Sequence, residues 1–299
     1  MQRRHQLLTL LVMVIWGFNF SAIKLAVTGI NPLLMTALRF SFATLPLLVF
    51  IPRPAVSWRY LLGYGFSFGV GVWGMASWAM SMALDPGLTS MIEQLSVVFT
   101  TLAGLWLFRE TLSRYQWLGI TMAIVGVIVL VGLPDHPPAL LGCLLLLIST
   151  LSWAVASCLV KRAAPANVFA FSLWGMAMAP LPLIGLTWLI FGGAPFVSLV
   201  THPPLNSLLA VLFQAYPTTL FGYWVWNHML VRYPLSVVSP LMLLVPIFGV
   251  LGGVWFYHEP FGCSAALGGA LMLCGVVLVT IPLRWSWLRK ISKATFNLS

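Results

Sequence analysis

The chain has 299 residues, of which 61% are hydrophobic and only 7% are charged, with fifteen Lys or Arg against five Asp or Glu. A soluble domain carries roughly 25% charged residues because its surface faces water, so a water-soluble globule of this size is excluded. Intrinsic disorder is excluded as well, since it requires low hydrophobicity and high charge. The apolar residues form unbroken runs of about twenty, not the roughly ten-residue alternating segments of a barrel strand, which predicts an all-α integral membrane protein.

Breaks at proline, glycine and charged residues divide the chain into ten predicted transmembrane helices of about twenty residues each. The predicted helices cover residues 7–27, 33–51, 61–84, 87–108, 115–132, 140–160, 168–191, 206–230, 235–256 and 263–283. The first is predicted to be a helix and not a cleaved signal peptide, because it contains Trp16, Asn19 and Lys24 and precedes many further apolar runs. The longest connection, residues 192–206, is too short to form a domain, so the whole chain is predicted to lie in the membrane.

The basic residues are distributed unequally between the connections on the two sides of the predicted helices. Thirteen of them fall on one side and none in the opposite connections: Arg3, Arg4, Arg53, Arg59, Arg109, Arg114, Lys161, Arg162, Arg232, Arg284, Arg289, Lys290 and Lys293. Because Lys and Arg accumulate on the cytoplasmic side of inner-membrane proteins, both termini are predicted to be cytoplasmic. A nucleic-acid partner would need a basic stripe on a folded surface, and these dispersed residues instead act as topology signals.

The two halves of the sequence resemble each other. Trp16 and Lys24 lie the same number of residues apart as Trp153 and Lys161. Further matches pair Asn31 and Pro46 with Asn167 and Pro182, and, at one constant offset, Trp106, Glu110, Leu118, Gly119 and Gly126 with Trp255, Glu259, Leu267, Gly268 and Gly275. Each half contains an odd number of predicted helices, so residues 138–299 enter the membrane from the side opposite to residues 1–137. Such inverted repeats are typical of alternating-access transporters with the substrate site between the halves.

Two motifs carry a resemblance to a known family. Helix 7–27 reads Trp-Gly-Phe-Asn-Phe from Trp16, with Lys24, and is followed by Pro32 and Arg39-Phe40; residues 239–246 read SPLMLLVP. Both motifs resemble the EamA branch of the drug/metabolite transporter superfamily, in particular the O-acetylserine/cysteine exporters of bacterial inner membranes. The resemblance covers essentially the whole chain. It implies ten helices in a 5+5 inverted repeat and export of small metabolites, typically amino acids and their derivatives.

Three side chains that are charged at neutral pH lie within the predicted helices: Lys24, Arg39 and Glu93. An ionised group at mid-bilayer costs about 2.5–3.5 kcal/mol on insertion scales, so each requires a partner or an aqueous lining. Arg39 and Glu93 follow helix-starting prolines at equal distances and are therefore expected at equal depth, about 10 Å below the outer surface. One hypothesis is a structural ion pair between them. The other is that Arg39 attracts a substrate carboxylate while Glu93 meets an ammonium group or titrates a coupling proton.

Lys24 has two possible roles. In the last turn of its helix a cation complements the helix dipole and extends its ammonium group outward, as its repeat counterpart Lys161 does. Alternatively, Trp16, Asn19 and Lys24 share an arc of about 140° and line one wall of a cavity.

The remaining candidates come from two further predicted helices and one turn. Tyr64 and Trp78 lie on one face with small residues, which indicates either a ligand site bracketed by aromatic rings or a helix-packing seam. Helix 206–230 is the most polar and aromatic, and Gln214 and Tyr223 are its best candidates for substrate contact. Glu259, in the turn before helix 263–283, is expected to stabilise the N-terminal end of that helix.

The sequence therefore predicts an inner-membrane exporter of small amino-acid-like metabolites, with the lipid bilayer and a small-molecule substrate as partners. A second hypothesis within transporters is a broad-specificity exporter of cationic drugs that uses Glu93. An intramembrane enzyme is the alternative from another class, but no predicted helix contains an Asp and no HExxH motif occurs, so no enzyme activity is expected. Scattered His and Cys residues and the absence of a P-loop motif predict neither a metal nor another cofactor, and the oligomeric state is left open.

Overall fold

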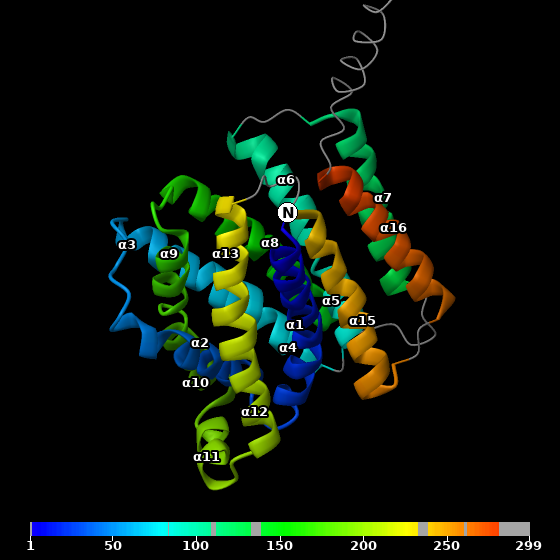
Figure 1. The fold of residues 1–299 in the computed structure, drawn as a ribbon. Helices are drawn as coiled ribbons and strands as arrows, with labels where there is room; N and C mark the ends of the chain where they lie inside the picture. The colour runs from blue at the N-terminus through cyan, green and yellow to red at the C-terminus, as the bar shows by residue number, and fades with distance from the viewer. Residues whose placement is uncertain are drawn as a thin grey trace, which may run out of the picture.

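A computed structural model describes residues 2–82, 84–108, 112–132, 139–232, 239–259 and 262–280. Within these ranges the secondary structure is helical and contains no strand. The helices form one bundle, with α7 (Arg114–Gly132) and α16 (Cys263–Thr280) paired at one edge and α3 (Trp58–Tyr64) and α9 (Val168–Met176) at the other (Figure 1). In the part of the chain that the structure describes, six helices are long and apolar enough to cross a membrane, and three shorter apolar helices accompany them. The predicted all-α class is confirmed.

The elements lie close to the predicted helices. In the first half they are α1 (Arg3–Val27), α2 (Pro32–Leu48), α3, η1 (Gly65–Gly74), α4 (Met75–Ser81), α5 (Pro86–Ile92), α6 (Leu95–Phe108) and α7. In the second half they are α8 (Leu140–Ala163), α9, α10 (Pro180–Phe191), α11 (Ala194–Thr201), α12 (Leu205–Phe213), η2 (Gln214–Phe221), α13 (Gly222–Arg232), η3 (Ser239–Leu243), α15 (Leu244–Tyr257) and α16. The connection predicted over residues 192–206 is not a plain loop, because it contains α11.

Two asparagines start equivalent helices. The Asn31 side chain accepts hydrogen bonds from the backbone amides of Leu33 (3.1 Å) and Leu34 (3.4 Å), and Pro32 occupies the first helical position of α2. The Asn167 side chain accepts from the amide of Ala170 (3.0 Å) at the start of α9. Each side chain satisfies amides that have no carbonyl partner within the first helical turn. The matched asparagines of the sequence repeat are thus N-caps.

Two of the predicted helices are interrupted. The helix predicted over residues 87–108 breaks between α5 and α6, where the Gln94 amide donates to Met91 (2.9 Å) and the Ser96 amide donates to Glu93 (3.1 Å) in tight i→i+3 bonds. The helix predicted over residues 168–191 likewise breaks between α9 and α10. Such breaks occur at membrane depth only where other protein groups satisfy the backbone.

Two further helices change their winding in mid-course. η1 and η2 are π-helical and continue directly into the α-helices on either side. η2 contains Pro217, which has no amide hydrogen to donate to the preceding turn. Two residues later, the Thr219 hydroxyl donates to the Gln214 carbonyl (2.8 Å). Wide π turns are frequent at functional sites.

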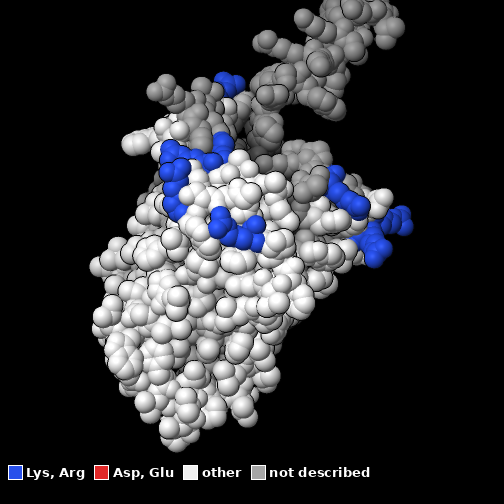
Figure 2. Space-filling view, turned by 90° about the vertical axis from the view of Figure 1, so that its left-hand side faces the viewer, with Lys and Arg blue, Asp and Glu red and all other residues white. Residues whose placement is uncertain are grey.

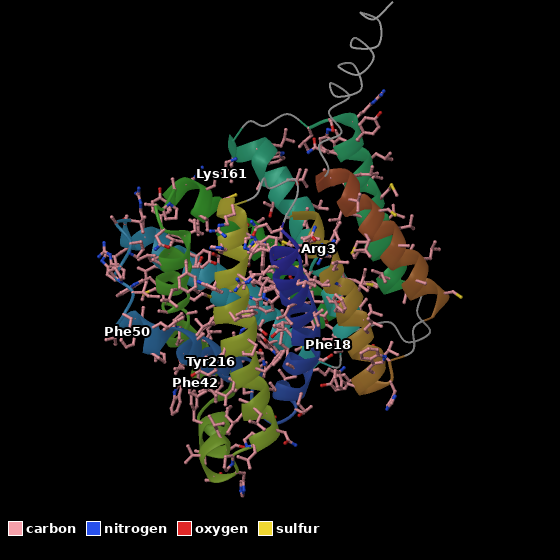
Figure 3. All side chains as sticks on the ribbon, in the orientation of Figure 1. Arg3, Phe18, Phe42, Phe50, Lys161 and Tyr216 are labelled. Atoms are coloured by element: carbon pink, nitrogen blue, oxygen red, sulfur yellow. The ribbon has the colours of Figure 1, made fainter. Side chains whose placement is uncertain are left out.

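α1 runs through the middle of the bundle and packs against elements of the second half (Figure 1). Its residue Phe18 faces α15 (Figure 3), where the ring lies 6.3 Å from that of Phe248 and 6.1 Å from that of Trp255. A Cβ at Gly17 would collide with the Phe248 side chain, so this glycine allows the two helices to approach closely. The interface between the halves therefore passes along α1.

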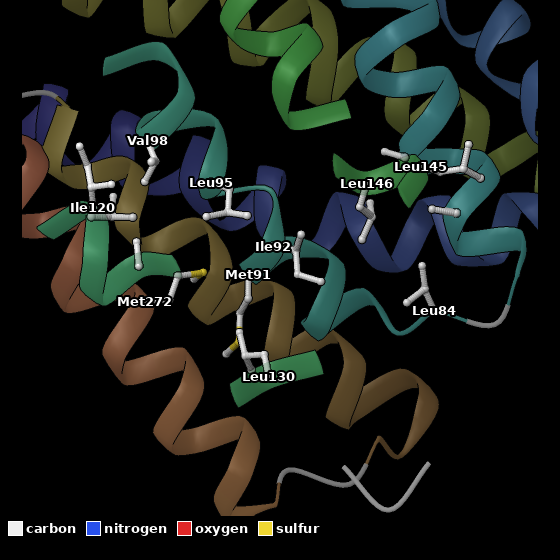
Figure 4. Packing of buried hydrophobic residues seen from close by; sticks show 14 of the residues in the cluster. Leu84, Met91, Ile92, Leu95, Val98, Ile120, Leu130, Leu145, Leu146 and Met272 are labelled. Atoms are coloured by element: carbon white, nitrogen blue, oxygen red, sulfur yellow. The ribbon is translucent and has the colours of Figure 1, made fainter. Parts of the chain in front are cut away.

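α7 and α16 associate through glycines. A Cβ placed on Gly275 would lie 2.5 Å from the Gly119 carbonyl and the Ala123 amide, and one on Gly126 would lie 2.5 Å from the Met272 amide. Small residues of this kind let membrane helices pack backbone against backbone. The pair joins the rest of the bundle through a buried apolar cluster from α4–α8 and α16 (Figure 4).

Positive charges gather toward one end of the molecule. On the face shown in Figure 2 all Lys and Arg atoms lie in the upper part, and the lower part shows no charged group. Figure 3 places Arg3 and Lys161 toward this same end. The described basic residues visible in this view thus lie toward one end of the molecule. Five of the thirteen basic residues lie outside the described residues: Arg109, Arg284, Arg289, Lys290 and Lys293.

Candidate functional site

Arg39 of α2 is the most unusual buried residue of the described chain. Its side chain is 1% exposed, and its Nε donates a hydrogen bond to the Thr219 hydroxyl of η2 (3.1 Å). Its Nη1 and Nη2 have no hydrogen-bond partner among the described residues. The guanidinium carbon lies 4.2 Å from the centroid of the Trp73 ring, a cation–π contact. A buried guanidinium thus presents two unused amino groups inside the bundle.

Glu93 lies elsewhere, so the predicted Arg39–Glu93 ion pair is wrong. Glu93 occupies the break between α5 and α6, and its Oε1 accepts a hydrogen bond from the Ser149 hydroxyl of α8 (2.6 Å). Among the described residues the one ion pair is Lys24–Asp85. The expected equal depth does not bring the two groups together, because α2 packs against α10 and η2, while α5 packs mainly against α15 and α6 against α8.

The surroundings of Glu93 suit a proton. The Ser149 oxygen also lies 3.0 Å from the Val72 carbonyl, so its single hydroxyl proton serves two acceptors. If the Glu93 carboxyl is protonated, it donates to Ser149 while Ser149 donates to Val72, and each group has a partner. If the carboxyl is ionised, one acceptor is left unsatisfied. The Glu93 carboxyl can therefore bind and release a proton. The free-energy difference between its protonated and ionised forms depends on the charges around it.

Three buried polar side chains lie on α1 and η2 without partners. Asn19 and Gln214 are fully buried and Thr218 is 2% exposed, and neither their amide groups nor the Thr218 hydroxyl forms a hydrogen bond with the described residues. The two elements are joined by the Trp16 Nε1, which donates to the Thr218 carbonyl (3.0 Å). Buried polar groups in proteins normally have partners, so a cluster of unpaired ones indicates a place for a polar ligand.

Aromatic rings border these polar groups. The Trp16 ring centroid lies 5.5 Å from that of Tyr223 and 5.7 Å from that of Trp226. Phe68 of η1 contacts Tyr223 at 5.8 Å, and Tyr64 stacks on Phe68 at 5.0 Å. The structure therefore brings Trp16 and Tyr223 together directly and places Tyr64 one ring further away.

Trp78 does not belong to this group. Its ring lies 5.7 Å from that of Phe191 at the end of α10, and it is a packing residue there. Gly71 and Gly74, from the same predicted face, pack against Ser152 of α8 and Leu183 of α10, which agrees with the packing-seam hypothesis for this face.

Sequence reasoning missed three residues of the site: Trp73, Ser149 and Thr219. Each contacts one of the predicted ionisable residues. Ser149 and Trp73 stand in strongly apolar runs and carry no signal of their own. Thr219 lies in the polar helix next to Thr218, and nothing in the local pattern distinguishes it from the other polar residues of that helix.

Lys24 belongs to a separate polar group, the Lys24 cluster, formed by Lys24, Asp85, Tyr257 and Glu259. The Lys24 Nζ donates to the Leu84 carbonyl (3.0 Å) and to Asp85 Oδ1 (3.3 Å). The Glu259 Oε2 accepts from the Gly87 amide at the start of α5 (3.3 Å). The Tyr257 hydroxyl donates to the backbone carbonyl of Ser21 in α1 (2.8 Å).

The Lys24 cluster corrects one expectation, because Glu259 accepts from the Gly87 amide at the N-terminal end of α5 and not from the helix that follows it. Lys24 pairs with Asp85, and its place in one cavity wall with Trp16 and Asn19 stays a prediction. Glu259 enters this position because Gly253 has no Cβ to exclude its carboxylate. The contacts tie α1 and α5 to the end of α15 and so close this end of the bundle.

Glu259 makes the cluster sensitive to pH. Burial and the negative charge of Asp85 raise the pKa of Glu259 to about 7, against the opposing effects of the Gly87 amide and Lys24. Its pKa is thus higher in the folded protein than its ordinary value of 4.5. The folded state therefore holds this proton more tightly than the unfolded chain, and the stabilisation is lost as the pH rises from about 4.5 to about 7.

We expect the melting temperature of the detergent-solubilised protein to fall between about pH 5 and about pH 8, and Glu259→Gln to flatten this fall. Differential scanning fluorimetry at both pH values measures the melting temperature of the wild type and of the variant. The control is His258→Asn, which removes the adjacent imidazole. Asparagine tolerates the left-handed backbone at this position (φ 53°), so the fold of the turn is kept. An unchanged slope in Glu259→Gln would show that other groups carry the pH dependence.

Comparison with known proteins completes the description of the site. The model of the family described as "EamA-like transporter family" matches residues 4–132 and 140–281. The chain is 31% identical over 95% of its length to a protein of Escherichia coli (strain K12) named "Probable amino-acid metabolite efflux pump", of which 97% is covered. A protein of the same name from Salmonella typhimurium is 33% identical, with 93% of this chain and 95% of that protein covered. A protein of known crystal structure shares the fold with a TM-score of 0.62, at 20% identity, over 94% of this chain and 97% of that chain.

Proposed function

The chain belongs to the EamA-like transporter family, and we propose that it exports small amino-acid-like metabolites across the bacterial inner membrane by alternating access. Similarity to two proteins named as amino-acid metabolite efflux pumps supports the substrate class and the direction. A family of transporters also supports the expectation that the chain is not an enzyme.

The proposed topology has ten crossings with both termini in the cytoplasm. Five of the crossings are the single helices α1, α2, α7, α8 and α16. The other five each combine consecutive elements: α3 with η1 and α4, α5 with α6, α9 with α10, α12 with η2 and α13, and η3 with α15. The gathering of Lys and Arg toward one end supports that end as the cytoplasmic one (Figure 2).

An inverted repeat of residues 1–137 and 138–299 is supported by equivalent features in the two halves. The family model matches one stretch in each half, and the break between the stretches falls close to the proposed boundary. The offset that aligns Trp106 with Trp255 also aligns the first residues of three pairs of elements. These are η1 with η2, α6 with α15, and α7 with α16. Repeats that agree in such irregular features support a common architecture for the two halves.

The observation that carries the function is the group of buried, unpaired polar side chains at the interface between the halves. Arg39 and Asn19 come from the first half, and Gln214 comes from the second. We place the substrate among Trp16, Asn19, Arg39, Gln214 and Tyr223, with Glu93, which bonds to Ser149, as a separate proton or ammonium site. Lys24 pairs with Asp85 at the end of α1, Tyr64 supports Tyr223 through Phe68, and Trp78 packs against Phe191 away from the substrate.

Metabolite profiling tests the function directly. Cells that overproduce the full-length protein are expected to accumulate amino acids or their derivatives in the medium, compared with cells carrying an empty vector and cells overproducing an unrelated membrane protein. Hydrophobic cationic drugs are tested in the same cells by survival. Drug resistance without any excess amino acid outside would favour the cationic-drug hypothesis and contradict the proposed substrate class.

A further inference from the structure

The buried guanidinium of Arg39 lacks the partner that its surroundings require. A buried cation normally has an acid or several hydrogen-bond acceptors beside it, because the apolar interior penalises an unpaired charge strongly. Here no described acid pairs with Arg39, and the ring of Trp73 covers one face of the guanidinium without accepting its Nη hydrogens. An anion would supply the partner that Arg39 lacks.

Thr219 fixes the direction in which this group points. Its hydroxyl donates to the Gln214 carbonyl (2.8 Å) and accepts from Arg39 Nε (3.1 Å). The first bond ties the hydroxyl to the backbone of the π-helical segment η2, so a single hydroxyl connects this backbone to Arg39. With Nε held by Thr219, the two Nη groups remain as a planar fork. Such a fork matches the two oxygens of a carboxylate.

The neighbouring elements supply uncharged hydrogen-bonding groups and no second cation. Gln214 and Thr218 lie on η2, the element that holds Thr219, and Asn19 lies on α1, which is joined to η2 through Trp16. One positive charge among amide and hydroxyl groups suits a monoanion. A phosphate dianion is usually met by several cations, which the described residues do not provide here.

From this geometry we propose that Arg39, oriented by Thr219, binds the carboxylate of the transported metabolite, with the side-chain amides of Asn19 and Gln214 beside it. This proposal rests on the proposed function. It names the chemical group of the substrate that the buried polar residues around Arg39 recognise. Thr219 is a positioning residue that does not itself touch the substrate. The substrate class is a small monocarboxylate whose remaining part meets the rings of Trp16 and Tyr223.

The test uses the full-length protein in proteoliposomes and compares acids with their neutral counterparts. The probes are L-cysteine, L-leucine and L-phenylalanine, each beside its carboxamide, which lacks the negative charge. The wild type is expected to transport at least one acid faster than its amide. Arg39→Gln is expected to reduce this acid-over-amide preference roughly tenfold to a hundredfold, as the loss of charge-assisted hydrogen bonds predicts. Arg39→Lys keeps the charge without the fork and is expected to be intermediate.

Thr219 provides a second pair of variants. Thr219→Val preserves shape but removes the hydroxyl and is expected to raise the KM for the acid more than it lowers kcat, whereas Thr219→Ser is expected to restore both. The melting temperature of each variant without substrate monitors folding. Because Arg39 has no partner acid, Arg39→Gln is expected to unfold at a temperature no lower than the wild type does.

The outcomes separate the two proposals. If the wild type transports acids and amides equally, the carboxylate site is wrong while the proposed function stands. A correctly folded Arg39→Gln that keeps the wild-type preference contradicts the carboxylate site in the same way. If the wild type transports none of the probes and the cells export no amino acid, the proposed function fails and the carboxylate site fails with it.

Discussion

Glu93→Gln is expected to lower export roughly tenfold or more while the amount of protein in the membrane stays unchanged. Glutamine keeps the size of the side chain and can still bond to Ser149, so the break between α5 and α6 should persist. It can neither carry a negative charge toward an ammonium group nor exchange a proton. Export is measured as the rate of appearance of the identified metabolite in the medium, normalised to membrane abundance.

Two control variants make this result specific to the carboxyl group. Glu93→Asp keeps the charge on a shorter side chain and should retain part of the export. Ser149→Ala removes the hydroxyl partner and should shift the pH at which export is half-maximal more than it changes the maximal rate. Full export by Glu93→Gln would eliminate both a coupling proton and a substrate ammonium at this position. Loss of the protein from the membrane would instead assign Glu93 a structural role.

Gly275→Leu is expected to destabilise the folded protein by about 3 kcal/mol, near the upper end of typical overpacking. A Cβ at this position would lie 2.5 Å from the Gly119 carbonyl and the Ala123 amide, and neither backbone atom can move without separating α7 from α16. Since the total stability of a domain is about 5–15 kcal/mol, the membrane abundance should fall severalfold. Thermal unfolding in detergent and quantitative immunoblotting of membranes measure the effect.

Gly185→Leu is the matched control for this substitution. Gly185 lies within α10, and a Cβ there would meet no atom within 4 Å. The same change of residue should therefore leave the abundance unchanged, because leucine fits a lipid-facing helix and favours helix over coil. Equal loss of protein in both variants would show that glycine matters for reasons other than the contact between α7 and α16.

The two central charged residues show where sequence reasoning reached its limit. Helix positions after Pro32 and Pro86 predicted equal depths for Arg39 and Glu93 from the constant rise per residue. Depth says nothing about the direction in which a side chain leaves its helix within the folded bundle. That direction depends on which helices are neighbours, and the structure turns Arg39 toward Thr219 and Glu93 toward Ser149.

The irregular helices were also beyond prediction from local patterns. Pro217 indicated a disturbance in its helix, and the structure places a π-helical segment there. The equivalent segment η1 contains no proline, and the break at Glu93 follows no helix-breaking residue. In both places another helix approaches closely: Ser152 of α8 lies against Gly71, and Ser149 of α8 bonds to Glu93.

The sequence by itself determined the membrane class, the approximate ranges of the helices, the side on which the basic residues gather and the short set of polar residues available for a site. These properties follow from transfer free energies and helix geometry, which act residue by residue along one chain segment. Only the tertiary structure decided which polar groups meet: Arg39 with Thr219, Glu93 with Ser149, and Lys24 with Asp85. The physical reason is that short-range hydrogen bonds depend on how helices rotate and pack against one another. Hydropathy sets only their position along the membrane normal.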